Sequence, residues 1–502
     1  MIIVRIQDIL WGIFLLWVFC HRYIPMDVSS LWKYALVGLI FFLVRSGSVP
    51  IRKGMTLAML CWGLCEVIVV LLQEWHWISS NHQWFETTGT FGNPGPLGGF
   101  LGILCAGVID SIRRQQQKGI KILPLVAVGG LLLYGMVTSG SRAGLLAALT
   151  GVAVGFFQRV ISFVQNGYKK RAVIECMLLF ILVCIGSVFL YRLRPFSANG
   201  RLLVWFNTLR LMAEHPFVGW GSGGWTGNYM LYQADFLATH PNSQFVQLAD
   251  NVAYPYNEWL RIGVEHGLFG LILFVWIIVE NLKIRQYDWL SGSLKTSLWA
   301  FLIFSLFSYP FDVIQLLVLW AFLVGMAKSR PVIQLLVSTH IRRLAFFIVA
   351  IILSILSIHL YGLYWKTWHD YELFPYFQYN PDIMYMYAQK KLEDSDSIHK
   401  SELLEQTAQL CPNSQTYCWL GDDLMKRGKY REAKFFYQKA TDMVPTKITS
   451  HYKLFKLYLA EGDTVSALSM GRKVLTLKLK VESIRNLKMR GEIKRFLQEY
   501  DE

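Results

Sequence analysis

The sequence predicts an all-α protein: a polytopic bundle of about eleven transmembrane helices, followed by a carboxyl-terminal domain of helical repeats. Of its 502 residues, 54% are apolar and 17% are charged, against about 25% charged in a typical soluble domain. The apolar residues form blocks near the roughly 20 residues that cross a bilayer as a helix. After residue 364 charges become frequent and the apolar residues follow an amphipathic helical period.

The predicted spans follow the apolar blocks in chain order. They are residues 9–23, 34–44, 55–72, 95–109, 122–138, 143–157, 172–191, 259–279, 298–308, 313–327 and 344–364. The short segment 308–312 contains Pro310 and is predicted to be a tight turn outside the cytoplasm. The first block lacks a small-residue cleavage site, so we expect an uncleaved first helix rather than a signal peptide.

The basic residues predict the orientation of these spans. Loops rich in Lys and Arg stay in the cytoplasm, and here such residues gather in alternate loops: Arg45, Arg52, Lys53, Arg113, Arg114, Lys118, Lys121, Arg159, Lys169, Lys170, Arg171, Lys283, Arg285, Lys295, Lys328, Arg330, Arg342 and Arg343. A cytoplasmic amino terminus then places the carboxyl terminus and the loops 73–94 and 192–256 outside. The net charge of +15 is therefore interpreted as a topogenic signal, and no nucleic-acid binding is expected.

The change of composition divides the chain into residues 1–364 and 365–502. Residues 417–445 resemble the tetratricopeptide repeat at its marker positions, which are Leu420, Gly421, Gly428, Tyr430, Ala433, Tyr437, Ala440 and Pro445. A shift by the 34 residues of that repeat carries Leu420 to Leu454 and Gly428 to Gly462. Such repeats present a concave face, which predicts a docking surface for a protein partner or an acceptor. The alternative is a cap that stabilises the membrane domain.

The cysteines predict no metal centre. Six of the eight lie in or beside apolar helices, where a thiol is a small apolar filler. Cys61 and Cys65 are one helical turn apart but lack a third ligand nearby. Cys411 and Cys418 lie in the carboxyl-terminal domain, and the sequence does not decide whether they are oxidised to a disulfide. We expect neither a metal nor a cofactor.

The polar chemistry gathers at the outer ends of the helices. Few ionisable residues lie within spans, which argues against a transporter, since transporters place polar sites near the midplane. The preference of Lys and Arg for cytoplasmic loops does not explain arginines that are predicted to lie outside the membrane. These are Arg142, Arg192, Arg194, Arg201 and Arg210. Guanidinium groups bind phosphate bidentately, so these residues predict a phosphate site at the headgroup plane. Pairing with lipid phosphates or loop carboxylates is the simpler alternative for any one of them.

Three segments of the membrane domain resemble the O-antigen ligase and polymerase family of bacterial glycosyltransferases, which includes O-linking oligosaccharyltransferases. The first is Thr90-Phe91-Gly92-Asn93-Pro94, and the second is Ser139-Gly140-Ser141-Arg142-Ala143. The third is the loop that opens with Gly200-Arg201 and Trp205, continues through 216–223, and closes with Tyr256-Asn257-Glu258 before Glu265-His266-Gly267. The resemblance covers roughly residues 85–330.

The resemblance implies transfer of a glycan from undecaprenyl pyrophosphate to an acceptor, either lipid A core, a protein or a growing glycan, at the outer face of the bacterial inner membrane. It implies that Arg142 and Arg201 stabilise the departing pyrophosphate. The remaining substrate-binding residues would be Asn93, Arg192, Arg194, Trp205, Arg210, Tyr256 and Asn257.

One departure from the family concerns the general base. Many members place a His beside the Asn of the closing motif, and this chain has Tyr256 there. A phenol with a pKa near 10 is a poor base. Glu258 is the first candidate to replace the His, although a carboxylate at a helix start also favours the helix dipole. Glu265, His266 and His240 are weaker candidates.

Two other functions stay open at this point. A polymerase of the same family would use the same donor headgroup and a different acceptor. A membrane-anchored scaffold would use the repeats to assemble envelope partners without chemistry.

Overall fold

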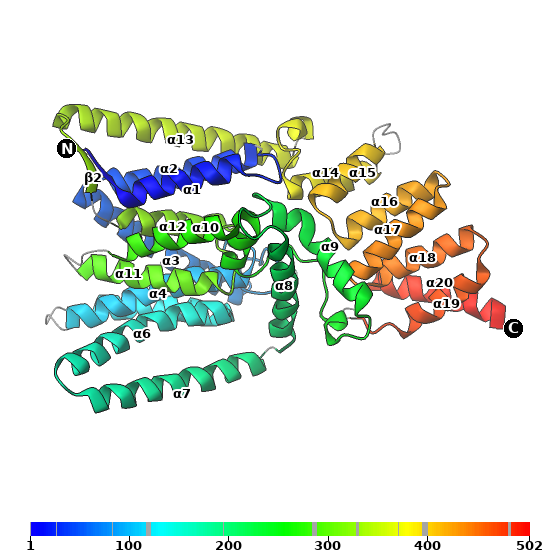
Figure 1. Cartoon of the computed structure of the whole chain (residues 1–502), viewed down its shortest axis with the longest axis horizontal. Coiled ribbons are helices and arrows are strands. Elements are labelled where there is room, and N and C mark those ends of the chain that lie inside the picture. Colours follow the sequence, from blue (N-terminus) through cyan, green and yellow to red (C-terminus); the bar gives the residue numbers. More distant parts are fainter. Residues whose placement is uncertain are drawn as a thin grey trace.

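The computed structural model describes residues 2–501 apart from 27, 83, 117–121, 194, 284–288, 328–330, 370, 394–399 and 480–482. Within these residues it contains twenty α-helices, two 3-10 helices and one pair of short strands. Figure 1 shows a bundle of long helices at one end and a stack of shorter helices at the other. The helical membrane architecture agrees with the prediction, and the strand pair is a feature that the sequence analysis missed.

Eleven helices of the bundle overlap the predicted apolar blocks. They are α1 (Ile6–Cys20), α2 (Val28–Ser46), α3 (Val49–Glu74), α4 (Pro94–Gln116), α5 (Leu123–Thr138), α6 (Arg142–Gln165), α7 (Lys169–Leu193), α10 (Glu258–Leu282), α11 (Trp289–Ser305), α12 (Ile314–Met326) and α13 (Thr339–His369). Five of them, α3, α4, α6, α10 and α13, are long and apolar enough to cross a membrane, and α1, α5 and α12 are shorter apolar helices. The chain is a membrane protein, and the number of spans stays a prediction.

α4 forms the centre of the bundle. Its most apolar stretch is 83% buried, compared with 28% for α3 and α6. Small residues allow this burial: a Cβ atom at Gly102 would lie 2.3 Å from the carbonyl oxygen of Gly144 in α6. Close backbone contact of this kind is typical of membrane helix interfaces. It fixes the first turn of α6, where Arg142 lies.

The two strands lie at the end of the bundle away from the shorter helices (Figure 1). β1 (Ile2–Arg5) pairs antiparallel with β2 (Pro331–Leu335), so the first residues of the chain are joined to the segment between α12 and α13. Several predicted cytoplasmic or site residues lie outside the described residues, namely Lys118, Lys121, Arg194, Arg285, Lys328 and Arg330.

Residues 216–223, called the strap below, cross α10 at a kink. Gly267 interrupts α10 with φ +61° and ψ −163°, so the amides after it lack their usual helical acceptors. The strap supplies them, because the carbonyls of Pro216 and Phe217 accept the N–H groups of the two residues that follow Gly267, at 2.8 and 3.1 Å. Two of the motifs selected from the sequence are therefore partners of one another.

The far end of the strap is held by α10 and by the chain after α1. The N–H of Gly221 donates to the carbonyl of Glu265 at 2.8 Å, and Ser222 exchanges backbone hydrogen bonds with the residues that follow α1. The strap passes so close that a Cβ atom at Gly219 would lie 2.5 Å from the carbonyl carbon of Glu265. Gly219 also has φ +78°, which only glycine adopts freely.

The strap connects the two helices of the long loop between α7 and α10. α8 (Pro195–Glu214) lies across the end of the bundle, and α9 (Gly224–Thr239) leads from it to the shorter helices (Figure 1). The 3-10 helix η1 (Gln244–Gln247) follows. One apolar cluster joins α8, α9 and α10 to Met443 and Val444, and Gln233 of α9 donates to the carbonyl of Met443 at 2.8 Å.

The carboxyl-terminal part consists of three helical hairpins and a last helix. After η2 (Tyr371–Tyr376) come α14 (Pro381–Glu393), α15 (Lys400–Leu410), α16 (Ser414–Lys426), α17 (Tyr430–Met443), α18 (Ile448–Ala460), α19 (Thr464–Thr476) and α20 (Ile484–Asp501). Residues related by the 34-residue shift have equivalent places: Ala433 and Ala467 are buried, and Gly428 and Gly462 both have positive φ. Membership of the tetratricopeptide family stays a prediction, as does the boundary at residue 364, which α13 passes before it ends.

The strap generates a stability prediction. Gly219→Ala introduces a Cβ against the backbone of α10 and a non-glycine residue at positive φ, which alone costs about 1–3 kcal/mol. We expect a lower thermal midpoint for the detergent-purified protein. Gly200→Ala on α8 is the matched control, since a Cβ there meets nothing within 4 Å. Equal midpoints for the two variants would show that the strap does not hold α10.

Candidate active site

Two of the predicted arginines lie near one another at the end of the bundle that faces the shorter helices. Arg142 is the first residue of α6, and its Nη2 donates to Oγ of Ser197 on α8 at 3.1 Å. Arg201 lies one turn further along α8. Burial lowers the pKa of the Arg201 guanidinium, and the charge of Arg142 lowers it further. Two cations held this close favour an anion beside them.

Arg201 also lies over an aromatic ring. Its guanidinium carbon is 5.3 Å from the ring centre of Tyr256, within the range of a cation–π contact. Tyr256 meets Tyr309 edge to face, and Tyr309 stacks on Tyr254 with the ring centres 4.0 Å apart. Burial raises the pKa of the Tyr256 hydroxyl, and the smaller effect of Arg201 opposes it. The phenol is therefore protonated at neutral pH and can donate a hydrogen bond.

The backbone at Tyr256 has φ +53°, a left-handed conformation that a bulky residue adopts only when its surroundings impose it. Two predicted substrate-binding residues provide those surroundings. The indole N–H of Trp205 donates to the carbonyl of Pro255 at 3.1 Å. Oδ1 of Asn257 accepts the N–H of Leu260 at 3.1 Å and so caps α10. Both side chains fix the position of the Tyr256 ring beside Arg201.

Asn93 lies at the start of α4, next to the first turn of α6. Its Oδ1 accepts the N–H of Gly95 at 2.9 Å, and the carbonyl of Gly95 accepts the hydroxyl of Ser141 at 3.0 Å. The preceding loop is held by Glu66 of α3, whose carboxylate accepts both the N–H and the hydroxyl of Thr90 at 2.9 and 2.6 Å. Two helix amino termini thus lie together near Arg142, and such termini favour anions.

The other predicted arginines do not join this pair in the same way. Arg210 lies nine residues after Arg201 on α8, or about 13 Å along the helix, and pairs with Asp235 of α9 at 3.1 Å. Arg192 is exposed near the end of α7, and Arg194 lies outside the described residues. The structure brings Arg142 and Arg201 together and directs Arg210 toward α9.

Glu258, the candidate base, is the first residue of α10 and is 2% exposed. Its Oε1 accepts the N–H of Phe311 at 3.0 Å. Its Oε2 lies 3.9 Å from Nη1 of Arg261 and has no hydrogen-bond partner among the described residues. Arg261 also pairs with Glu265, at 3.5 Å, and with Asp312. Glu258 is therefore one of three carboxylates that share one guanidinium.

The weaker candidates for the base have structural partners. Oε1 of Glu265 accepts the N–H of Gly223 at 3.1 Å, just before α9 begins. His266 is 4% exposed and its ring packs edge to face against Phe14. His240 ends α9, where Nδ1 lies 3.0 Å from a carbonyl oxygen of the preceding turn.

Three residues that the sequence analysis did not select complete the arrangement: Ser197, Tyr309 and Asp312. Tyr309 and Asp312 lie in the segment 308–312, for which the sequence predicts only a turn. The available signal was an aromatic and an acidic residue together at the outer ends of two apolar helices. No sequence signal distinguishes Ser197.

Comparison with known proteins identifies one family for this region. Residues 127–275 match the family model described as O-antigen ligase. The matched segment includes Arg142, α8 with Arg201, and the residues from Tyr256 to Glu258, whereas Asn93 and the helical hairpins lie outside it. No curated protein matches the chain significantly. This region is therefore similar to O-antigen ligases, which supports a membrane glycosyltransferase-like function.

Proposed function

We propose that the chain transfers an oligo- or polysaccharide from undecaprenyl pyrophosphate to an acceptor at the outer face of the bacterial inner membrane. The observation that carries the proposal is the juxtaposition of Arg142 and Arg201, because both lie inside the matched segment and Arg142 is near enough for its charge to lower the pKa of Arg201. Their position at the end of the bundle suits a donor whose lipid tail stays in the bilayer.

In the proposed reaction the acceptor hydroxyl oxygen attacks the anomeric carbon of the glycan, and the bond from that carbon to the pyrophosphate oxygen breaks. The pair of electrons leaves with undecaprenyl pyrophosphate, whose new negative charge Arg142 and Arg201 stabilise. The hydroxyl proton passes to a base, for which we propose Glu258. Tyr256, protonated and held beside Arg201, donates a hydrogen bond to the same phosphate oxygens.

Ligase and polymerase activities share this donor chemistry and differ in the acceptor. We favour a ligase because the hairpins pack directly on α9, which offers an outer surface where an acceptor such as lipid A core or a protein can be presented. A polymerase and a scaffold without chemistry are the alternatives. The lipid-linked glycan that accumulates in a deletion strain distinguishes a ligase from a polymerase, since loss of a polymerase leaves single repeat units.

The arginine pair generates the main prediction. Arg142→Gln and Arg201→Gln each remove one charge from the departing pyrophosphate, so we expect glycan transfer to fall by about 10²–10³-fold. Complementation of a deletion strain, with surface glycan measured on carbohydrate gels, checks this. Arg171→Gln is the matched control, because Arg171 is an exposed arginine of α7 whose partner is Glu175.

Membrane content of each variant must equal that of the parent. Normal glycan from both arginine variants at that content would refute the enzyme assignment and favour the scaffold.

Glu258→Gln tests the base. The glutamine oxygen can still accept the N–H of Phe311 while the side chain can no longer take a proton, so transfer should fall by about 10²–10⁴-fold. Glu280→Gln, at the other end of α10 where Glu280 pairs with Lys283, serves as the control. Unchanged transfer by Glu258→Gln would mean that Glu258 only supports the loop.

A further inference from the structure

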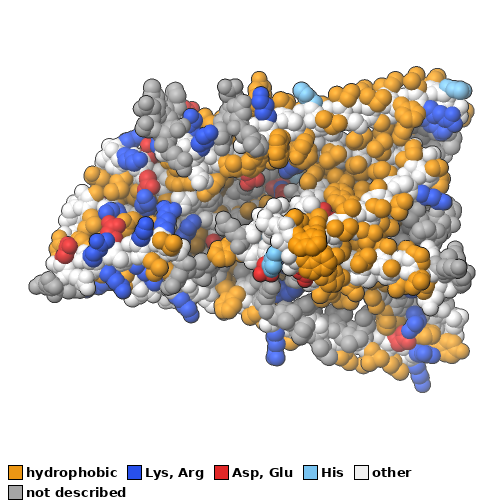
Figure 2. Space-filling view, turned by 180° about the vertical axis from the view of Figure 1, so that it is seen from behind, with side chains coloured by type: hydrophobic (Ala, Val, Ile, Leu, Met, Phe, Trp, Pro, Cys, Tyr) orange, Lys and Arg blue, Asp and Glu red, His pale blue; other side chains and the backbone are white. Residues whose placement is uncertain are grey.

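A cavity of about 780 Å³ lies between the bundle and the helical hairpins, within the range of about 300–1,000 Å³ that is usual for ligand sites. Figure 2 shows a hollow where the two parts meet, with acidic and basic side chains in it. The lining includes Tyr254, Pro255 and Glu258, but among the described residues it includes neither Arg201 nor Tyr256. The arginine pair is therefore not part of the lining, whereas Glu258, the proposed base, is.

The deeper half of the cavity is apolar and lies between helices of the bundle. Aromatic and aliphatic side chains from α1, α2 and α12 line it, namely Trp11, Phe14, Val37, Phe41, Trp320 and Val324. Gly38 of α2 opens this half, since a Cβ atom there would meet nothing within 4 Å. A slot of this composition at the depth of the bilayer fits a hydrocarbon chain.

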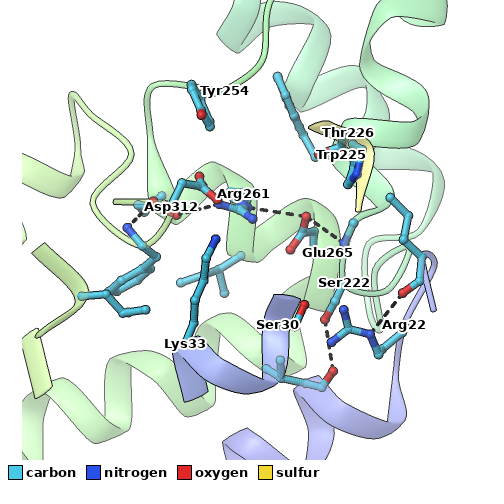
Figure 3. A pocket seen from close by; sticks show the side chains of 18 of the residues that line it. Arg22, Ser30, Lys33, Ser222, Trp225, Thr226, Tyr254, Arg261, Glu265 and Asp312 are labelled. Carbon is cyan, nitrogen blue, oxygen red and sulfur yellow. Dashed lines mark hydrogen bonds and ion pairs between the residues drawn. The ribbon is translucent and has the colours of Figure 1, made fainter. Parts of the chain in front are cut away.

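The other half is charged, with Arg22 and Lys33 on one side. Figure 3 shows Arg22 and Lys33 entering from the end of α1 and from α2, opposite Arg261 and Asp312. Nε of Arg22 donates to the carbonyl of Ile24 at 3.1 Å, whereas its Nη1 is buried without a hydrogen-bond partner among the described residues. A buried donor without a partner is costly, so this position favours an anionic ligand group.

The acidic side of the charged half contains Asp312 and, from α14, Asp382. Arg261 is already shared by Asp312 and two glutamates. Burial raises the pKa of Asp382, the charge of Lys33 lowers it, and the charge of Asp312 raises it. Asp382 and Asp312 therefore lie within electrostatic range of each other. In total the lining contains four carboxylates, two guanidinium groups and one lysine. Its formal charge is therefore −1 when all are ionised, which favours a ligand cation beside the carboxylates.

We propose that this cavity binds a zwitterionic membrane lipid of the phosphoethanolamine class. One acyl chain lies in the slot between α1, α2 and α12, the phosphate meets Arg22 and Lys33, and the ammonium meets Asp382 and Asp312. The lipid joins the bundle to the first hairpin, because its headgroup contacts residues of both. This site goes beyond the proposed transfer reaction. The two share Glu258, but lipid binding is measured without the reaction.

Native mass spectrometry of the full-length protein tests the proposal. The protein is exchanged into dioleoyl phosphatidylethanolamine or dioleoyl phosphatidylglycerol, which differ only in the headgroup. We expect one retained phosphatidylethanolamine, favoured about fivefold over phosphatidylglycerol, the effect of one additional ion pair. Asp382→Asn should abolish the preference while a lipid is still retained.

Gly38→Phe should remove the retained lipid, because the ring fills the slot. Gly12→Phe is the matched control, since Gly12 belongs to the neighbouring α1, a Cβ atom there would also meet nothing within 4 Å, and the residue does not line the cavity. Equal retention of both lipids by the parent, or a retained lipid in Gly38→Phe, would overturn the proposal. Displacement of phosphatidylethanolamine by equimolar undecaprenyl phosphate would overturn it too, because the site would then select the donor lipid.

Discussion

The arrangement of the bundle end that faces the shorter helices depends on the hydrogen bonds between the strap and the kink of α10. A helix interrupted inside a membrane protein must satisfy its freed amides internally, and here the carbonyls of Pro216 and Phe217 do so. The same contact fixes the loop between α8 and α9, so the direction of α8 follows from it. Arg201 is carried by α8, and the hairpins rest on α9. These hydrogen bonds therefore affect the position of Arg201 and of the carboxyl-terminal part, whereas the contact between Gly102 and Gly144 fixes Arg142.

The arginine pair is a local source of instability that a ligand can relieve. Burial and a second cation both act against the charge of Arg201, and within the described residues the Tyr256 ring offers it a cation–π contact instead of a carboxylate. A guanidinium placed in this way is poised for an anion, because binding replaces repulsion with charge-assisted hydrogen bonds. Arg210 is different, since Asp235 already neutralises it. Arg201 and Arg210 are the same residue type in the sequence, and only their surroundings in the fold distinguish them.

The sequence alone predicted the helical membrane architecture, because apolar blocks and charge asymmetry are local properties of the chain. The 34-residue shift likewise placed Ala433 and Ala467 at equivalent buried positions. Contacts between distant segments could not be predicted from the sequence. No periodicity indicates that the strap binds the residues after Gly267, or that Asp312 completes the cluster around Arg261. The nearness of Arg142 and Arg201 came from the family resemblance rather than from spacing, since 59 residues separate them. Tyr309 was missed because the prediction of a turn does not indicate which aromatic rings the side chain of Tyr309 contacts.

Tyr256 lies where the resemblance leads us to expect a His, and Glu258, which we propose as the base instead, belongs to the cluster around Arg261. Glu258, Glu265 and Asp312 share one guanidinium, so the cluster carries a formal charge of −2 when all three are ionised. Uptake of one proton reduces the repulsion among the carboxylates. Glu258 is suited to accept that proton, because its Oε1 is held by Phe311 while its Oε2 has no hydrogen bond within the described part of the chain. In the proposed reaction the protonated phenol of Tyr256 donates a hydrogen bond and the carboxylate of Glu258 takes the proton, so two side chains divide these two functions between them.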